Sequence, residues 1–165
     1  MKNILTFIIV IAAVTSLYSG NSYIITNGIV NDTATGLYWT RCSLRANGAI
    51  DSSKNCEETL GQFTWEEAID ACNNLNYESH KDWRLPNIRE LQSIVTYYNI
   101  EGLIDRAINV TAFPNTGRHY WTSTTNKSQS TTAWAIDFSY GNVTFDFKET
   151  STTPAYKYVR CVTGP

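Results

Sequence analysis

Few side chains in this 165-residue sequence are suited to chemistry, and they are far apart along the chain. His119, between Arg118 and Tyr120, has the side-chain type of a general acid or base. A catalytic base needs an orienting partner, and the sequence identifies none for this histidine. The chain also lacks a nucleophile elbow, a zinc-protease helix motif and a glycine-rich phosphate loop. We therefore interpret His119 as a partly exposed surface residue.

Carboxylates are the second group that could do chemistry. Asp137, Asp146 and Glu149 lie close together in the sequence, and a glycosidase needs two such groups about 5–9 Å apart. The alternating pattern of residues 132–147 predicts strands with polar side chains on one face. That face would carry both aspartates into solvent. We expect no enzymatic activity.

Ligand recognition is the chemistry that the remaining polar residues favour. The best candidates are in or near a long connection at residues 100–119, and they are Arg106, Arg118, His119 and Tyr140. An arginine binds a sulfate or a carboxylate with two parallel hydrogen bonds. Without Lys2 the chain has 12 basic and 15 acidic residues, a formal charge of −3, so attraction to polyanions is expected to be weak and salt-sensitive.

The four cysteines indicate disulfides rather than a metal site. No two of Cys42, Cys56, Cys72 and Cys161 form a C-x-x-C pair, and only two histidines are present. Four cysteines allow three connectivities, and their spacing does not choose among them. No cofactor is indicated.

The N-terminus predicts export. Residues 1–20 combine one lysine with an apolar run at residues 4–14, which is typical of a signal peptide and short for a membrane anchor, the alternative. Residues 21–165 then form a single domain with no further hydrophobic segment, located in the periplasm, at the cell surface or outside the cell. The near-neutral charge gives no reason to expect nucleic acid as a partner.

The elements that must position these residues follow from capping and periodicity. Thr64 and Asn87 each begin a helix with a glutamate at the third helical position; the first is expected to run to about Leu75 and the second to near Asn99. Residues 29–42 predict a hairpin, with a tight turn at residues 140–142 in a later meander. Further strands are expected at residues 120–124, 132–138, 143–147 and 156–162. This order predicts an α+β fold in which two helices pack on a twisted antiparallel sheet.

Six short motifs occur together in a recognisable order, although no single one is specific: DTATGLYW (32–39), WEEA (65–68), DWRLPN (82–87), AFPNT (112–116), YWTST (120–124) and YVRCV (158–162). In this series the chain resembles the bacterial family named after the C-terminal domain of the Legionella collagen-like protein. The resemblance implies a C-type-lectin-like architecture with a long loop region. It also implies that Cys72 pairs with Cys161, which leaves Cys42 for Cys56.

The resemblance further implies a secreted or surface-exposed, adhesin-like role, because the named member binds sulfated glycans. Calcium is not expected, since the Pro-Asn pairs at residues 86–87 and 114–115 lack the preceding carboxylate that calcium-dependent lectins use. We expect a non-enzymatic binding module for a glycan or a host or cell-surface ligand. The alternative is a structural envelope domain that binds another exported protein. The oligomeric state is not predicted.

Overall fold

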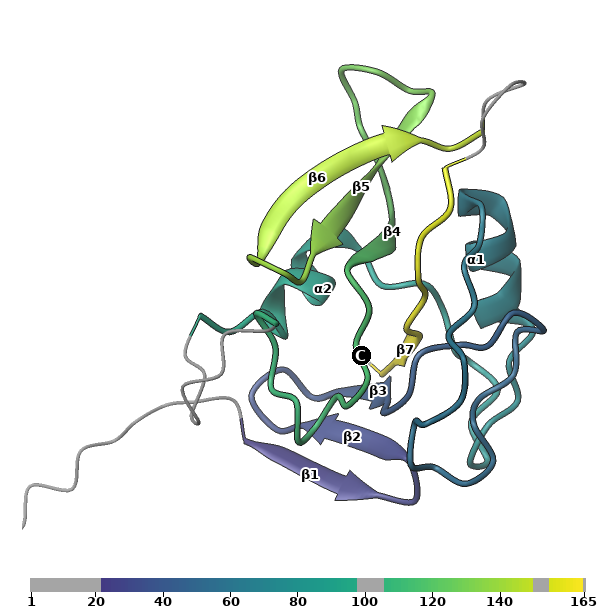
Figure 1. Ribbon diagram of the computed structural model, residues 1–165, viewed down its shortest axis with the longest axis vertical. Coiled ribbons are helices and arrows are strands. Elements are labelled where there is room, and N and C mark those ends of the chain that lie inside the picture. Colours follow the sequence, from purple (N-terminus) through teal and green to yellow (C-terminus); the bar gives the residue numbers. More distant parts are fainter. Residues whose placement is uncertain (1–21, 98–105, 150–154, 165) are drawn as a thin grey trace, which may run out of the picture.

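The two ends of the described chain meet in one antiparallel sheet. The computed structural model describes residues 22–97, 106–149 and 155–164, so the predicted signal peptide lies outside it. Four strands follow the order β1-β2-β3-β7: β1 (Tyr23–Thr26), β2 (Ile29–Asp32), β3 (Leu37–Thr40) and β7 (Val162–Thr163) (Figure 1). The β2–β3 pair confirms the predicted hairpin.

A second antiparallel sheet carries the predicted meander. Its order is β4 (His119–Thr125), β5 (Thr132–Asp137) and β6 (Asn142–Phe147), so β6 is an edge strand. Gly141 ends the turn before β6 with a φ of 75°, the left-handed conformation expected there. The fold is therefore α+β with two sheets where a single twisted sheet was expected.

Both helices begin where the sequence predicts. In α1 (Trp65–Asn73) and α2 (Ile88–Ser93), the capping side chain and the third-position glutamate each bond the other's backbone amide. The prediction that the second helix reaches Asn99 is wrong. Val95 instead forms a β-bridge with Ile108, and the Thr96 amide donates to the Ala107 carbonyl, so this backbone bonds to another segment and leaves the helix.

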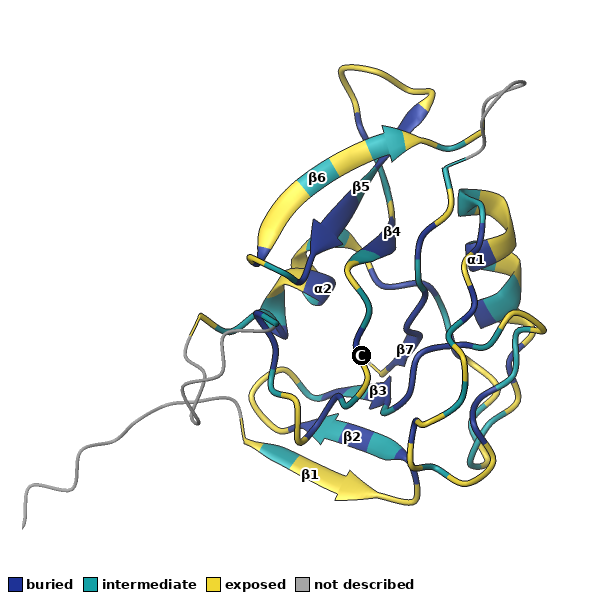
Figure 2. Ribbon diagram, in the orientation of Figure 1, coloured by how far each residue is buried: buried dark blue, intermediate teal, exposed yellow. Residues whose placement is uncertain are grey.

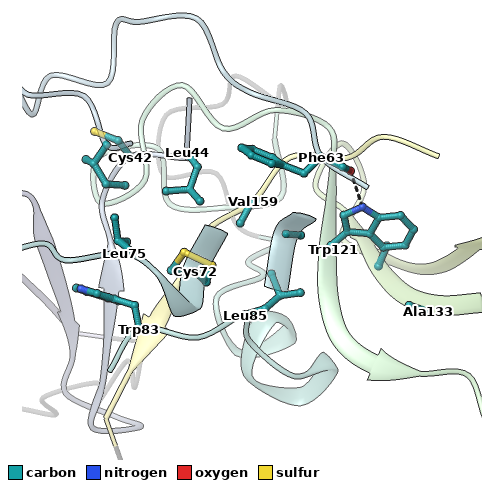
Figure 3. Packing of buried hydrophobic residues seen from close by; sticks show 14 of the residues in the cluster. Cys42, Leu44, Phe63, Cys72, Leu75, Trp83, Leu85, Trp121, Ala133 and Val159 are labelled. Carbon is teal, nitrogen blue, oxygen red and sulfur yellow. Dashed lines mark hydrogen bonds between the residues drawn. A yellow bond between two sulfur atoms is a disulfide. The ribbon is translucent and has the colours of Figure 1, made fainter. Parts of the chain in front are cut away.

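The helices cover opposite faces of the second sheet. One face of β4 and β5 belongs to a core cluster with α1, and the other belongs to a cluster with α2. Figure 3 shows the first cluster, where the Trp121 ring N–H donates to the Phe63 carbonyl at 2.9 Å. Across the register, Trp121 and Ala135 face α1, whereas Tyr120 and Ile136 face α2.

In strand β6 the apolar residues are exposed, contrary to the prediction. The sequence predicts that its apolar residues face inward, but Val143, Phe145 and Phe147 are 40%, 53% and 43% exposed. Their register with β5 puts them on the α2 face, and α2 packs on β4 and β5 without extending over β6. Figure 2 shows the resulting exposed stretches along this strand.

The C-terminal segment is extended, as predicted, but only Val162 and Thr163 belong to a strand. Its other residues bond to four separate segments. Lys157 bonds to Phe63 in both directions, Tyr158 bonds to β4, and the carbonyls of Val159 and Cys161 accept from Leu44 and Thr40. This segment therefore lies between the two sheets and connects them.

Two disulfides close the described chain. Cys42 pairs with Cys56 and Cys72 pairs with Cys161, the connectivity that the family resemblance implied. The first closes a loop, and the second joins α1 to the C-terminal segment. Within the described residues, no helix has the length and apolar character needed to cross a membrane.

Arg160 is a fully buried cation at the centre of the molecule. Its Nη1 donates to the carbonyls of Thr40, at 2.7 Å, and Arg41. Its Nη2 lies 3.2 Å from the hydroxyls of both Ser43 and Thr116. Burial lowers the pKa of this guanidinium. Arg160 is therefore a structural hydrogen-bond donor.

We predict unequal losses of stability on removing the two disulfides. Replacing Cys72 and Cys161 together by alanine opens a separation of 89 residues and should lower the free energy of unfolding by about 4–5 kcal/mol. The corresponding Cys42 and Cys56 variant opens 14 residues and should lose about 3 kcal/mol. Urea unfolding of both variants tests this order, and a larger loss for the shorter loop would contradict it.

We predict that Arg160→Met loses about 3 kcal/mol or more, because several buried oxygens would each lose a donor at about 1–3 kcal/mol. Arg89→Met, at an exposed position of α2, is the matched control and should stay within about 0.5 kcal/mol of the parent protein. Equal urea midpoints for the two variants would show that the buried guanidinium contributes no net stability.

Candidate ligand-binding site

The candidate site is organised by Asp137 at the end of β5. This carboxylate is only 5% exposed, so the prediction that it lies in solvent is wrong. Its Oδ1 accepts from the Ser139 amide at 2.9 Å, and its Oδ2 accepts from Nε and Nη2 of Arg118, each at 3.2 Å. These bonds replace the water that a buried charge loses.

His119 has the partner that the sequence did not reveal. Its Nε2 lies 3.5 Å from Oδ2 of Asp137, the residue opposite it in the pairing of β4 with β5. Burial lowers the pKa of His119, and the attraction to Asp137 only partly offsets this effect. The imidazole is therefore mostly neutral at pH 7. Burial raises the pKa of Asp137, but the Ser139 amide and the neighbouring basic groups outweigh it and the net shift is downward.

Two tyrosines flank the turn that follows Asp137. Tyr140 is 66% exposed, and its amide donates to the Asp137 carbonyl at 3.3 Å. Tyr97 is 76% exposed, and its hydroxyl donates to the Gly141 carbonyl at 3.2 Å. A Cβ atom at residue 141 would lie 2.8 Å from the Tyr97 ring. Glycine is therefore needed here, because φ is positive and because the Tyr97 ring leaves no room for a side chain.

Arg106 lies on a segment next to the others, but it is less available. It is half-buried, and its Nε donates to the Thr116 carbonyl at 2.9 Å. The Ala107 amide donates to the Phe138 carbonyl, and the Phe138 amide donates to the Arg118 carbonyl. The structure therefore brings the segments of all four predicted residues together, with Arg118 and Tyr140 the most exposed of them.

The sequence analysis missed Asp137 and Tyr97 as members of this site. Asp137 had a local signal, because an aspartate two residues before a serine often bonds the backbone of its own turn. Tyr97 had no such signal, since its position depends on the early end of α2. Tyr98, which the predicted second helix would include, lies outside the described residues.

This arrangement is suited to binding rather than to strong attraction of anions. The Arg118 side chain is 58% exposed, yet Asp137 balances its charge, and His119 adds little positive charge at pH 7. Exposed phenol rings supply flat apolar surface with a hydroxyl at the edge. The combination can stack on a ligand and donate hydrogen bonds to it.

A separate polar groove runs beside α1, with a volume of about 640 Å³. Carboxylates, amides and the exposed ring of Tyr156 line it; they include Asn47, Gln62, Glu67, Asp70 and Asn74. The residues that line it include no lysine or arginine. The His119–Asp137 pair lies outside this groove.

No metal-binding cluster of three or more histidine, cysteine, aspartate or glutamate residues occurs in the part of the chain that the structure describes. The expectation that the protein uses no metal or cofactor stays a prediction, because the described residues alone do not test it.

We predict that Asp137→Asn lowers the pKa of His119 further. The carboxylate raises that pKa by favouring the imidazolium, so its loss leaves burial less opposed. An NMR titration of the imidazole protons measures the shift, with Asp70→Asn on the exposed side of α1 as the control. An unchanged or higher His119 pKa in Asp137→Asn would show that the two groups do not interact.

Comparison with known proteins supports the family resemblance. No curated protein matches the chain at a significant level. The family model of the Lcl C-terminal domain matches residues 28–163, which is most of the sequence. The chain therefore belongs to the Lcl C-terminal domain family.

Proposed function

We propose that this protein is an exported, non-enzymatic binding module that recognises a glycan on a cell or host surface. The glycan would bind at the turn site, which we define as Tyr97, Arg118, His119 and Tyr140. The single observation that carries this proposal is the pair of highly exposed tyrosines at the turn after Asp137, the carboxylate that binds Arg118.

The chemistry of the turn site favours a hydroxylated ligand. Tyrosine rings stack on the apolar faces of sugars, and the Arg118 guanidinium keeps exposed donors while Asp137 fixes its position. Because Asp137 also balances its charge, we expect stacking and hydrogen bonding to contribute more than charge. Binding should then depend only weakly on salt.

Export and a C-type-lectin-like architecture are part of the same proposal. The two disulfides are of the kind that persists in oxidising compartments. The N-terminal and C-terminal strands share a sheet, and a disulfide joins the first helix to the last strand segment, as the resemblance implies for such folds.

The non-enzymatic assignment rests on the surroundings of the His119–Asp137 pair. Such a pair is one half of a hydrolase mechanism, but Arg118 also binds this carboxylate. A hydrolase additionally needs a nucleophile within hydrogen-bond reach of the base. None of the hydrogen bonds described for His119 supplies one.

The alternative function is a structural envelope domain that binds another exported protein. The exposed apolar row of β6 favours it, because such surfaces often mark protein interfaces.

We predict that Tyr140→Ala and Tyr97→Ala each weaken glycan binding by about tenfold, the effect of losing one aromatic contact worth about 1 kcal/mol or slightly more. A glycan array at low salt identifies the ligand, and calorimetry with that glycan measures the loss. Tyr156→Ala, which removes a 52% exposed ring in the groove beside α1, should bind normally.

Two results would count against the proposal. An array that stays blank at low salt would remove the glycan as ligand and favour the envelope-domain alternative. A loss of binding in Tyr156→Ala but not in Tyr140→Ala would move the site to the groove beside α1.

A further inference from the structure

Strand β6 has an apolar side that nothing in the described structure covers. Val143, Phe145 and Phe147 alternate along it, and each is at least 40% exposed. On the neighbouring strand, the half-buried Trp134 contacts Phe145 edge to face, with 5.6 Å between ring centroids. Three consecutive positions of one face are thus apolar and open to solvent (Figure 2).

Val143 and Phe145 turn their backbone groups outward, whereas the Phe147 amide donates to Oδ1 of Asp146 at 2.9 Å. The Lys148 amide donates to the Thr131 carbonyl beyond the end of β5, so the even-numbered residues of this strand bond to β5. In an antiparallel ladder, bonded and non-bonded positions alternate. The amides and carbonyls of Val143 and Phe145 therefore point away from the sheet, along its free edge.

Another β-strand can bond all the donors and acceptors of such a row at once, because they repeat at every second residue. Natural proteins usually block such an edge with proline, a bulge or charged side chains. Strand β6 has no proline, and its pairing with β5 is continuous. Its one charged residue, Asp146, binds Lys157 at 2.8 Å on the other side and bonds only the Phe147 amide along the edge, so the backbone groups of Val143 and Phe145 stay open.

We propose that this edge binds β6 of a second copy of the same chain, forming a continuous six-stranded antiparallel sheet across a twofold axis. The occupant is a second copy because the strand is complementary to itself. An isologous contact of this kind is the commonest route to a protein dimer.

Self-complementarity also selects the register. With Phe145 opposite Phe145 of the second copy, Val143 lies opposite Phe147, and all the exposed apolar side chains pair on one face. On the other face, Thr144 lies opposite Asp146 and its hydroxyl can donate to that carboxylate. Moving the centre to Asp146 would place two carboxylates face to face, and moving it to Thr144 would place Phe147 opposite Gly141.

Charge does not oppose the contact. The carboxylate of Asp146 is paired with Lys157 of its own chain. The ammonium of Lys148 donates to the Thr125 hydroxyl at 2.8 Å and lies 4.1 Å from the Trp65 ring centroid. Both groups are on the α1 side, away from the apolar row.

The first test is the oligomeric state of the purified protein by sedimentation and light scattering over a range of concentrations. We expect a dimer whose dissociation constant rises at least about tenfold in Phe145→Lys. Ile24→Lys is the matched control, because Ile24 is a 54% exposed apolar residue on the other sheet's edge strand, β1. A monomer at every concentration, or a dimer that Ile24→Lys dissociates, would overturn the proposal.

The second test determines the register of the two strands. It remains valid if Phe145→Lys does not fold. Bonded antiparallel partners have Cα atoms about 5.5 Å apart, within the range for a disulfide. Phe145→Cys should therefore form a covalent dimer under mild oxidation, with the peptide containing residue 145 crosslinked to itself by mass spectrometry. Val143→Cys is the control, since its two copies would lie about 14 Å apart along the strands. Equal crosslinking of both variants, or crosslinking of Val143→Cys alone, would refute this register.

Discussion

The fold depends on the burial of one extended segment, residues 157–163, between two sheets. A buried backbone must have its polar groups bonded, and this segment achieves that by bonding in turn to Phe63, β4, residue 44 and β3. The Cys72–Cys161 disulfide fixes it to α1, and Arg160 fixes it to the loops around it. This segment bonds to both sheets, and together with the core cluster that they share it sets their relative position.

The same segment, residues 157–163, also positions the turn site. The Tyr158 amide donates to the His119 carbonyl, which sets the start of β4 where Arg118 and His119 lie. Arg160 bonds the Thr116 hydroxyl, and its guanidinium lies 4.8 Å from the Phe113 ring centroid. The described part of the long connection, residues 106–118, contains one isolated bridge, at Ile108, and is thereby held against the core. Its exposed end can then present side chains without much loss of conformational entropy on binding.

Local sequence signals predicted which helices and strands form. Non-local contacts determine where these helices and strands end and how exposed their residues are. Thr64 and Asn87 define the helix starts through bonds within four residues, so both starts were predicted correctly. The end of α2 depends on a bridge between Val95 and Ile108, which no local pattern encodes. Alternation likewise shows that Asp137 and Phe145 face opposite sides of their sheet. It does not show that α2 stops short of β6, which leaves Phe145 exposed, or that Arg118 and His119 lie against the Asp137 carboxylate, so for both residues the expected exposure was wrong.

The proposed dimer also has a consequence for the turn site. Tyr140 precedes β6 directly, so in the Phe145-centred register the two turns lie at opposite ends of the paired strands. Asn142 and its counterpart would then be about 20 Å apart along the strand direction. Two sites at a fixed separation on one rigid sheet bind a repeating surface ligand with a high effective concentration for the second contact. Under the proposed function, weak recognition through two tyrosines and one partly neutralised arginine would then suffice for surface attachment, because avidity supplies what the single site lacks.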